Sequence, residues 1–319
     1  MFGRSGSIRL SRTAGDEGGL TPSRRDPNAV RIGWVDLLVF GLLIGLAGFV
    51  AYRVQFVLHY RWNWSVIPRF MVRWDPTTQS WVPNLLLLGL FTTIRLTCWG
   101  AVIALVGGVM LALGRIGRNL AMRLTARTYV EFVRNIPELV FIFIFYFFVS
   151  SEIMPLLGLD QGLRGASPRT LAIVEVLFGS PAQFTSFLPA VFAIGLFEAA
   201  SVSEIIRAGV QSIGSGQWDA GAALGLTRGR TLRLIVIPQA LQRILPPLAG
   251  QVIALVKESS LAAIISVPEL TFSGNQVAVS TRGMFEIWLT VGAIYLCLCS
   301  TLSLLFARLE HLARSRAAS

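Results

Sequence analysis

Charge is scarce in this sequence, and lysine is nearly absent. Of the 319 residues, 14% are charged, whereas about 25% are charged in an ordinary soluble domain. Lysine occurs once, at Lys257. A phosphate-binding loop of the form G-x-x-x-x-G-K-[ST] needs its lysine directly after a glycine, and Lys257 follows Val256 instead. The sequence therefore excludes an ATPase site of this type within the chain.

Histidine and cysteine are also rare. The two histidines, His59 and His311, lie far apart and outside the long apolar stretches, which excludes a zinc-binding H-E-x-x-H helix. The three cysteines are Cys98, Cys297 and Cys299. All three lie within apolar stretches, and side chains two residues apart on a helix point in different directions. We therefore expect no disulfide, no metal site and no cofactor.

Hydrophobic residues, by contrast, make up 54% of the chain, and the mean hydropathy is +0.64. So few polar side chains cannot cover a water-soluble globule of this size. The composition predicts an all-α integral membrane protein, because helices satisfy their own backbone hydrogen bonds in lipid. The net charge of +11 is then explained by arginines in the loops that orient the helices, and it does not indicate a nucleic-acid partner.

Six apolar stretches approach or exceed the length of about 20 residues that a bilayer crossing takes. They are 34–52, 85–113, 136–154, 187–206, 244–267 and 285–306. If the N-terminus lies inside, nineteen arginines fall in inner segments and seven in outer ones. Positive charges collect on the cytoplasmic side of membrane proteins. The count therefore predicts about six transmembrane helices with both termini in the cytoplasm.

The stretches between the apolar runs predict the remaining organisation. Residues 1–33 are rich in Gly, Ser and Arg and predict a disordered cytoplasmic tail, and residues 310–319 predict a shorter one. Residues 34–84 combine the first helix with an outer, periplasmic segment whose tryptophans favour the headgroup layer. These are Trp62, Trp64, Trp74 and Trp81. Segment 155–186 is also outer, and its apolar piece 171–178 predicts a short surface helix.

The inner loop 207–243 is long, yet it is not a polar linker. Ser215 is suited to cap the start of a helix of about two turns. Gly225 is suited to the left-handed conformation that ends such a helix. Thr227 is placed to cap a second helix, which Pro238 is expected to stop.

The first of these two helices is rich in small residues, Ala220, Gly221, Ala222 and Ala223. Small side chains let another backbone come close, so the helix is suited to docking in a groove of a partner. The same pattern is typical of a surface helix packed against its own chain. From the residues alone, both interpretations stay open.

The spacing of residues in this loop is specific. Asp219-Ala220-Gly221 is followed after three residues by Gly225 and after nine more by Ile235-x-Ile237-Pro238. This spacing resembles the EAA loop of ABC-importer permeases, which reads E-A-A, three residues, G, nine residues, I-x-L-P. Three positions differ, with Asp for Glu, Gly for the second Ala and Ile for Leu. Each difference keeps the charge, the small size or the apolar character.

Four further stretches extend the resemblance to the polar amino-acid, histidine/glutamine-type permeases, over about residues 85–309. They are Thr93-x-Arg95-Leu96-Thr97, Tyr129-Val130-Glu131-Phe132-Val133-Arg134-Asn135-x-Pro137, Glu204-Ile205-x-Arg207-Ala208-Gly209 and Lys257-Glu258-Ser259-Ser260-Leu261. The resemblance implies a five-helix type I ABC importer core, preceded here by an extra N-terminal helix, in the bacterial inner membrane.

The resemblance also implies a transport subunit for polar amino acids that is not itself an enzyme. It implies that separate ABC ATPase subunits hydrolyse ATP and contact the loop. The coupling residues would be Asp219, Ala220, Gly221, Gly225 and Pro238. A periplasmic amino-acid-binding protein and a second permease subunit, identical or different, are the other implied partners.

Ionisable side chains within the apolar stretches are candidates for a substrate path, because each costs about 2.5–3.5 kcal/mol at mid-membrane without a partner or water. Lys257 and Glu258 lie in the stretch 244–267, and Glu198 lies in 187–206. An amino acid carries one carboxylate and one ammonium group, which Lys257 and an acidic group such as Glu198 would match. A salt bridge of Lys257 with Glu198 or Glu258 is the structural alternative.

Other polar residues of these stretches have similar alternatives. Gln251, Ser259 and Ser260 are suited either to line the path or to bond between helices. Glu204 and Arg207 stand three apart on a helix, which predicts a local ion pair. Arg95 is expected to snorkel toward the outer surface.

A second function stays open at this point. An ion-coupled secondary transporter or a channel would use the same intramembrane charges. Dependence of transport on a separate ATPase would distinguish these from an ABC importer. The mixed charges do not choose among acidic, basic and neutral amino acids.

Overall fold

The computed structural model describes residues 33–57, 60–117 and 119–318. The predicted tail 1–33 lies outside the described residues except for its last residue. Most of the described chain is helical, as the composition predicts. The chain divides into two compact units, which are described one at a time.

In the first unit, Met1–Arg61, the described residues form helix α1 (Trp34–Tyr52) and a π-helical turn, Arg53–Val57. α1 has 19 residues, which gives it a length of about 28 Å, close to the thickness of a bilayer core. None of its side chains is buried within the chain. A helix that is apolar on all sides is suited to lipid. The predicted extra N-terminal helix is therefore confirmed in length and composition.

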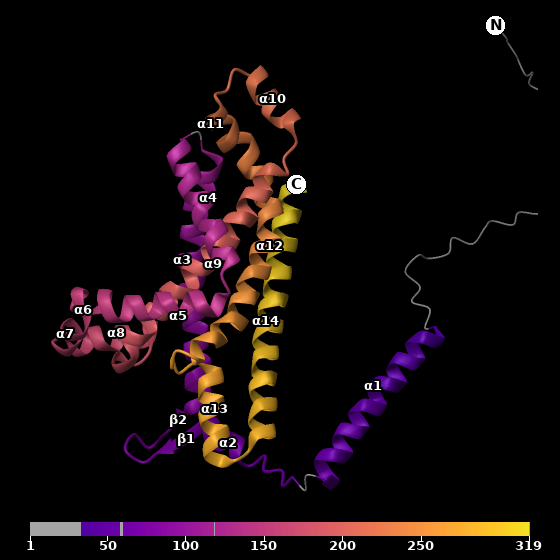
Figure 1. The fold of residues 1–319 in the computed structure, drawn as a ribbon, viewed down its shortest axis with the longest axis vertical. Coiled ribbons are helices and arrows are strands. Elements are labelled where there is room, and N and C mark those ends of the chain that lie inside the picture. The colour runs from indigo at the N-terminus through magenta and orange to yellow at the C-terminus, as the bar shows by residue number, and fades with distance from the viewer. Residues whose placement is uncertain (1–32, 58–59, 118, 319) are drawn as a thin grey trace, which may run out of the picture. The chain divides into compact units, whose positions relative to one another are not determined.

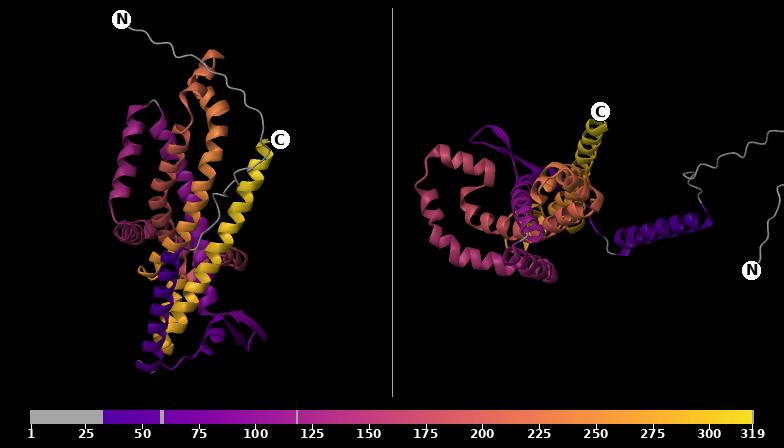
Figure 2. Two further views of the ribbon diagram at one scale, coloured as in Figure 1. Left: turned by 90° about the vertical axis from the view of Figure 1, so that its right-hand side faces the viewer. Right: turned by 90° about the horizontal axis from the view of Figure 1, so that it is seen from above.

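The second unit, Trp62–Ser319, is built around long helices that run side by side (Figure 1). They are α3 (Leu85–Ile116), α9 (Phe184–Gln211), α12 (Ile237–Glu258) and α14 (Met284–Ala318). α14 includes most of the predicted C-terminal tail. The short helices α10 (Ser215–Ala223) and α11 (Arg228–Thr231) lie at one end of this bundle, and α2 (Val66–Met71) lies at the opposite end (Figures 1 and 2).

Small residues bring α3 and α9 close together. A β-carbon at Gly195 of α9 would lie 2.7 Å from the β-carbon of Ile103 on α3. A β-carbon at Gly108 of α3 would overlap the side chain of Val202 on α9. Transmembrane helices associate through such close packing, because lipid provides no hydrophobic driving force between them. The core beside this contact contains Leu96, Ile142, Ile194 and Leu255.

The predicted stretch 244–267 is divided in the structure. α12 ends at Glu258, a 3-10 turn covers Ser259–Ala263, and α13 (Leu270–Thr281) follows. Among the described residues, five helical segments are long and apolar enough to span a bilayer, and they match the other five predicted stretches; the segment Glu138–Leu157 is made of α5, a π-helical turn and α6. α12 is more polar than these five, because it contains three charged residues, Arg243, Lys257 and Glu258. Its 22 residues are nevertheless about 33 Å long, enough to cross a bilayer core.

Helices α5 to α8 extend sideways from the bundle, and α5 runs across the long helices (Figures 1 and 2). They are α5 (Glu138–Phe148), α6 (Met154–Leu157), α7 (Leu159–Arg164) and α8 (Pro168–Phe178), with a π-helical turn, Val149–Ile153, after α5 and a 3-10 turn, Pro181–Gln183, after α8. The apolar piece 171–178 lies in α8, so the predicted short helix there is confirmed.

Two side chains of α3 hold the C-terminal end of α8. Arg95 Nε donates to the carbonyl oxygen of Val176, and Trp99 Nε1 donates to that of Leu177, each at 3.0 Å. Trp99 also stacks on Phe178, with ring centroids 5.0 Å apart. The last carbonyls of a helix lack intrahelical partners and favour a cation. Arg95, expected to snorkel, therefore has a partner within the protein.

α4 (Leu120–Asn135) is a helix that the apolar stretches do not predict. Its inner side buries Val130 and Val133 against the bundle. Tyr129 donates its hydroxyl to the carbonyl oxygen of Leu196 on α9 at 2.9 Å. Burial raises the pKa of the Tyr129 phenol, which keeps the hydroxyl a neutral donor.

A β-hairpin in the tryptophan-rich segment departs from the all-α prediction. Strands β1 (Val72–Asp75) and β2 (Ser80–Pro83) pair antiparallel, with Trp74 opposite Trp81. The ring centroids of these tryptophans lie 5.7 Å apart. Valine and tryptophan favour strands, and the intervening Pro-Thr-Thr-Gln sequence favours a turn. Local propensity therefore explains the hairpin, which the lengths of the apolar stretches do not predict.

Candidate functional site

α10 (Ser215–Ala223) is the first helix of the loop 207–243. It begins at Ser215, and Gly214 occupies the cap position without a side-chain hydrogen bond. The predicted capping role of Ser215 is therefore wrong by one residue. The cause is that Gly214 itself takes the extended conformation from which the helix starts.

The other end of α10 is as predicted. Gly225 has φ +72°, in the left-handed region. Its amide donates to the carbonyl of Ala222 at 2.9 Å, and the amide of Leu226 donates to that of Gly221 at 3.0 Å. These two bonds form a Schellman motif, in which glycine is preferred because it has no β-carbon. The predicted glycine stop is confirmed.

α10 has one packed face and one open face. Gly221 is buried, and a β-carbon there would overlap Thr231 at the end of α11 (Arg228–Thr231). Asp219 and Ala220 are exposed, and so is Leu224, at 74%. Packing against its own chain therefore explains the glycine in place of the second alanine of the E-A-A pattern. The open face remains available to a partner.

Pro238 does not stop the second helix of the loop, which corrects the sequence prediction. The chain stays helical from Arg228 through a π-helical turn, Leu232–Val236, into α12. Pro238 lies in the first turn of α12. Because the chain is already helical before Pro238, the missing amide interrupts the backbone hydrogen bonds, and the π-helical turn directly before it lies where the helix accommodates this interruption.

Glu204 on α9 forms an ion-paired group beside this end of the bundle. Its carboxylate accepts from Arg115 Nη1 of α3 at 2.7 Å. It also accepts from Arg207, three residues later on its own helix. The predicted local ion pair of Glu204 with Arg207 is confirmed, and Arg115 adds a second partner.

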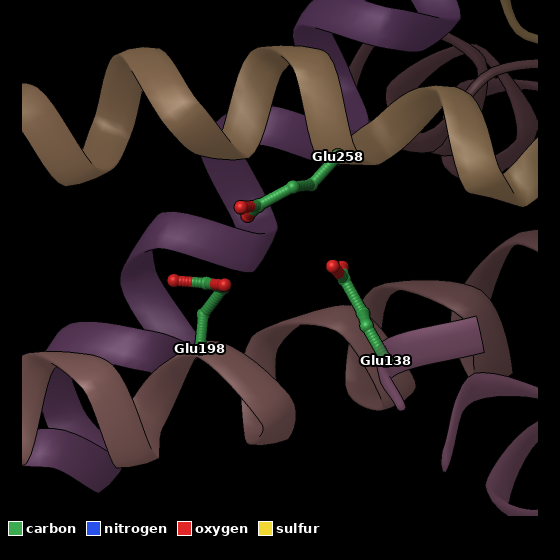
Figure 3. A group of neighbouring side chains, drawn as sticks. All are labelled: Glu138, Glu198 and Glu258. Carbon is green, nitrogen blue, oxygen red and sulfur yellow. The ribbon is translucent and has the colours of Figure 1, made fainter. Parts of the chain in front are cut away.

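A different group of carboxylates lies deeper in the bundle. Glu198 of α9, Glu258 of α12 and Glu138 of α5 point toward one another (Figure 3). One carboxylate oxygen of each lies within 4.8 Å of the others. Glu198 is 1% exposed. We call these three residues the acidic cluster.

Gln251 is the polar partner of the acidic cluster. Its amide nitrogen on α12 donates to Glu198 Oε2. Glu138 Oε1 and Glu258 Oε2 are buried and have no hydrogen-bond partner within the described part of the chain. Like charges repel strongly at such a site, and a cation or a proton would relieve the repulsion. The arrangement is therefore suited to receive a positively charged group.

The structure separates the other predicted path residues from the acidic cluster. Lys257 is exposed, whereas its neighbour Glu258 points into the cluster. None of the ion pairs among the described residues includes Lys257, so the alternative salt bridge with Glu198 or Glu258 is absent there. Ser259 is buried and donates to the carbonyl of Val256, in the last turn of α12, at 2.7 Å. Ser260 is half-buried.

Glu138 is a residue that sequence reasoning missed. It stands at the first position of α5, directly after Pro137. An acidic residue in the first turn of a helix is common, because the helix dipole favours it there. Its position in the sequence therefore does not indicate a functional role. Its proximity to Glu198 arises because α5 crosses the bundle.

Comparisons with known proteins identify the family to which the chain belongs. The chain matches the family described as "Binding-protein-dependent transport system inner membrane component" over residues 104–315. The glutamate/aspartate import permease protein GltK of Escherichia coli O6:H1 is 32% identical over 235 residues, covering 73% of this chain and 96% of GltK. The glutamine transport system permease protein GlnP of Escherichia coli K12 is 33% identical over 222 residues, covering 68% and 89%.

A solved structure is similar over a comparable share of the chain. It is described as an amino acid ABC transporter with histidines, and it is 28% identical with a TM-score of 0.57. The match covers 71% of this chain and 93% of that one. The resemblance inferred from the sequence motifs is thus confirmed. The chain belongs to the binding-protein-dependent transport system inner membrane components, and it is a multi-pass transport subunit of the inner membrane.

Proposed function

We propose that this chain is the permease subunit of an ABC importer that moves polar amino acids into the cytoplasm. Separate ATPase subunits hydrolyse ATP and contact α10. A periplasmic binding protein delivers the substrate at the opposite end of the bundle. The similar GltK and GlnP, named for glutamate/aspartate and glutamine, support polar amino acids as the substrate class.

The acidic cluster is the observation that carries this proposal. Every amino acid has an ammonium group, and Glu198, Glu258 and Glu138 converge from three helices on one point. Charge-assisted hydrogen bonds from an ammonium group to carboxylates are among the strongest that a protein makes. Gln251 adds an amide that can exchange its bond to Glu198 for one to the substrate.

The open face of α10 supports the contact with the ATPase. Asp219, Ala220 and Leu224 are exposed on it, and α10 lies at an end of the bundle (Figure 1). A small helix with exposed alanine and leucine side chains fits a groove in a partner. The Schellman motif at Gly225 and the start of α12 near Pro238 connect this helix to the bundle.

A second permease subunit is supported by Lys257. This lysine is exposed on a helix whose neighbouring residue, Glu258, is in the bundle interior. A charged side chain at such a depth does not face lipid, because the cost is too high. We expect Lys257 to face the path between two permease subunits, where Ser260 would accompany it.

The test of this proposal is the energy source of transport. The complete complex, with its ATPase and binding protein, is reconstituted in proteoliposomes and uptake of each of the twenty amino acids is measured. We expect uptake of one or more polar amino acids with ATP inside and none without ATP. Uptake driven by an ion gradient without ATP would instead establish the secondary transporter, and ion currents would establish the channel.

The coupling role of the loop has a matched pair of variants. Gly225 and Gly229 both have open space where a β-carbon would be added, but Gly225 alone of the two has a positive φ. Gly225→Ala therefore strains the end of α10 by about 1 kcal/mol, whereas Gly229→Ala does not. We expect lower ATP-driven uptake in the first variant and normal uptake in the second. Equal uptake in both would contradict the coupling role.

A further inference from the structure

The β-hairpin has one open apolar face. Its register pairs Val72 with Pro83 and Trp74 with Trp81. Alternate residues of a strand share a face, so these four side chains lie together, and we call them the hairpin face. Trp74 is 48% exposed and Trp81 68%, and Val72 and Pro83 are exposed as well. Val82, on the opposite face, is half-buried. The hairpin therefore packs on one side and is open on the other.

Hydrogen bonds fix the hairpin at the start of α3. β2 ends at Pro83, and α3 begins at Leu85. Asn84, between them, donates its backbone amide to the carbonyl oxygen of Met71 at 2.9 Å. Its side-chain amide donates to the carbonyl oxygen of Arg69 at 2.7 Å. Met71 and Arg69 belong to α2. The hairpin, α2 and α3 are therefore joined at one point, and the hairpin is held at the level where α3 begins.

The start of α3 marks a boundary of the bilayer core. Residues 85–88 are four consecutive leucines, and α3 is long and apolar enough to span a bilayer. Leu88, Phe91 and Ile94, three residues apart along the helix, are exposed. An exposed apolar stripe on a spanning helix is suited to lipid. Contact with acyl chains therefore begins within the first turn of α3, next to the hairpin.

The tryptophans of the hairpin face suit the layer between acyl chains and water. Tryptophan combines an apolar ring with an N–H donor, and it is enriched at membrane–water interfaces. The rings of Trp74 and Trp81 meet edge to face, with an interplanar angle of 72°. Trp288, in the second turn of α14, is exposed at the same end of the bundle (Figure 1). Tryptophans of two separate elements thus mark the same layer.

Positive charge accompanies these tryptophans. Arg69 on α2 and Arg73 on β1 are exposed, and neither takes part in the ion pairs that the described residues form. The carboxylate of Asp75 accepts instead from the amide and the hydroxyl of Thr77, at 2.9 and 2.7 Å. The fork of an arginine donates two parallel hydrogen bonds to a phosphate. Lipid phosphates lie just outside the layer that tryptophans favour, within reach of a long arginine side chain.

The position of the hairpin favours lipid over a soluble protein as the partner of this face. The hairpin projects sideways from the bundle, at the level where α3 begins (Figures 1 and 2). A transmembrane bundle is surrounded by the bilayer surface at this level. The headgroup layer therefore reaches the hairpin face without a further partner.

We propose that the hairpin face lies in the phospholipid headgroup layer, with Arg69 and Arg73 bound to lipid phosphates. The hairpin then holds the start of α3 at the bilayer surface. This interaction is independent of the proposed function, because the hairpin contributes no residue to the acidic cluster or to α10.

The test locates Trp74 and Trp81 in the complex of the permease with its ATPase, in lipid nanodiscs. Two quenchers of tryptophan fluorescence are compared. One is a phospholipid with bromine atoms on acyl carbons close to the headgroup, and the other is iodide in the water. Subtracting the emission of the double variant Trp74→Phe with Trp81→Phe from that of the wild type isolates the two rings. We expect the bromolipid to quench most of this difference and iodide to quench little of it.

Trp218→Phe is the matched control. Trp218 is half-buried on α10, at the opposite end of the bundle (Figure 1), and its difference emission should not respond to the bromolipid. A second double variant, Arg69→Gln with Arg73→Gln, keeps both hairpin tryptophans. We expect it to lower their quenching by the bromolipid on the order of twofold, because each arginine near charged headgroups adds to the attraction. Unchanged quenching would overturn the phosphate contact.

Three outcomes would overturn the inference and leave the proposed function standing. Strong quenching by iodide and none by the bromolipid would place the hairpin face in water. Loss of iodide quenching only when the binding protein is added would make the face a docking surface for that protein. Protection from both quenchers in the complex alone would indicate that a second permease subunit covers it.

Discussion

Two glutamates of α9 stand six residues apart and have opposite surroundings. Glu204 accepts hydrogen bonds from Arg115 and Arg207, so its charge is matched. Glu198 lies beside two other carboxyl groups and receives a bond from Gln251, which is neutral. A matched acid stabilises the helices it joins. An acid among other acids costs free energy in the empty protein, and such sites are typically functional.

Replacing Glu204 should have the largest effect on stability. Glu204→Ala leaves Arg115 and Arg207 without their carboxylate partner next to the apolar bundle. We expect a loss of about 1–3 kcal/mol in the free energy of unfolding, seen as a lower thermal midpoint of the purified complex and a lower yield of it. Uptake should fall in proportion to the complex that remains.

The double variant Glu204→Gln with Arg115→Gln is the control for this effect. It replaces a charged pair by two neutral partners and should recover part of the lost stability. If Glu204→Ala keeps the wild-type midpoint, the ion-paired group does not join α3 to α9 as described.

Replacing Glu258 should affect transport rather than stability. Glu258→Gln keeps the shape of the side chain and removes one of three like charges. We expect the rate of ATP-driven uptake to fall on the order of tenfold, about 1.4 kcal/mol. The thermal midpoint should stay the same or rise, because repulsion within the acidic cluster is reduced. A lower midpoint with normal uptake would place Glu258 with Glu204, as a structural residue.

The ion-paired group of Glu204 and the acidic cluster also differ in how well the sequence predicts them. Glu204 and Arg207 stand three apart on a helix, so their ion pair depends on local spacing and could be predicted. The acidic cluster joins residues from three helices. Glu198 and Glu258 were recognised as charges in apolar stretches, but Glu138 was not, because its place depends on α5 crossing the bundle.

The same distinction applies to the fold. The positions of the long helices follow from apolar length, and the end of α10 follows from Gly225. The prediction for Pro238 failed because a π-helical turn, Leu232–Val236, precedes it and the helix continues. The hairpin with Trp74 and Trp81 is not among the sequence predictions, because its tryptophans also suit the headgroup layer and were interpreted in that way.

A third glutamate, Glu131, forms an exposed ion pair and is expected to contribute least to stability. Glu131 on α4 pairs with Arg127 at 2.7 Å, and the two side chains are 55% and 65% exposed. Exposed ion pairs contribute little, because water screens them. We expect Arg127→Gln to change the free energy of unfolding by no more than about 0.5 kcal/mol, measured as the thermal midpoint. A larger effect would indicate that α4 has a partner on its open side.

The most direct test of the account is a paired measurement on Glu198→Gln. ATP-driven amino-acid uptake and ATP hydrolysis are measured in proteoliposomes with the complete complex, beside the wild type. We expect uptake to fall at least about tenfold, hydrolysis to continue and the complex to remain intact, because we propose that Glu198 binds substrate and that α10 contacts the ATPase. Normal uptake, or loss of the complex itself, would contradict this expectation.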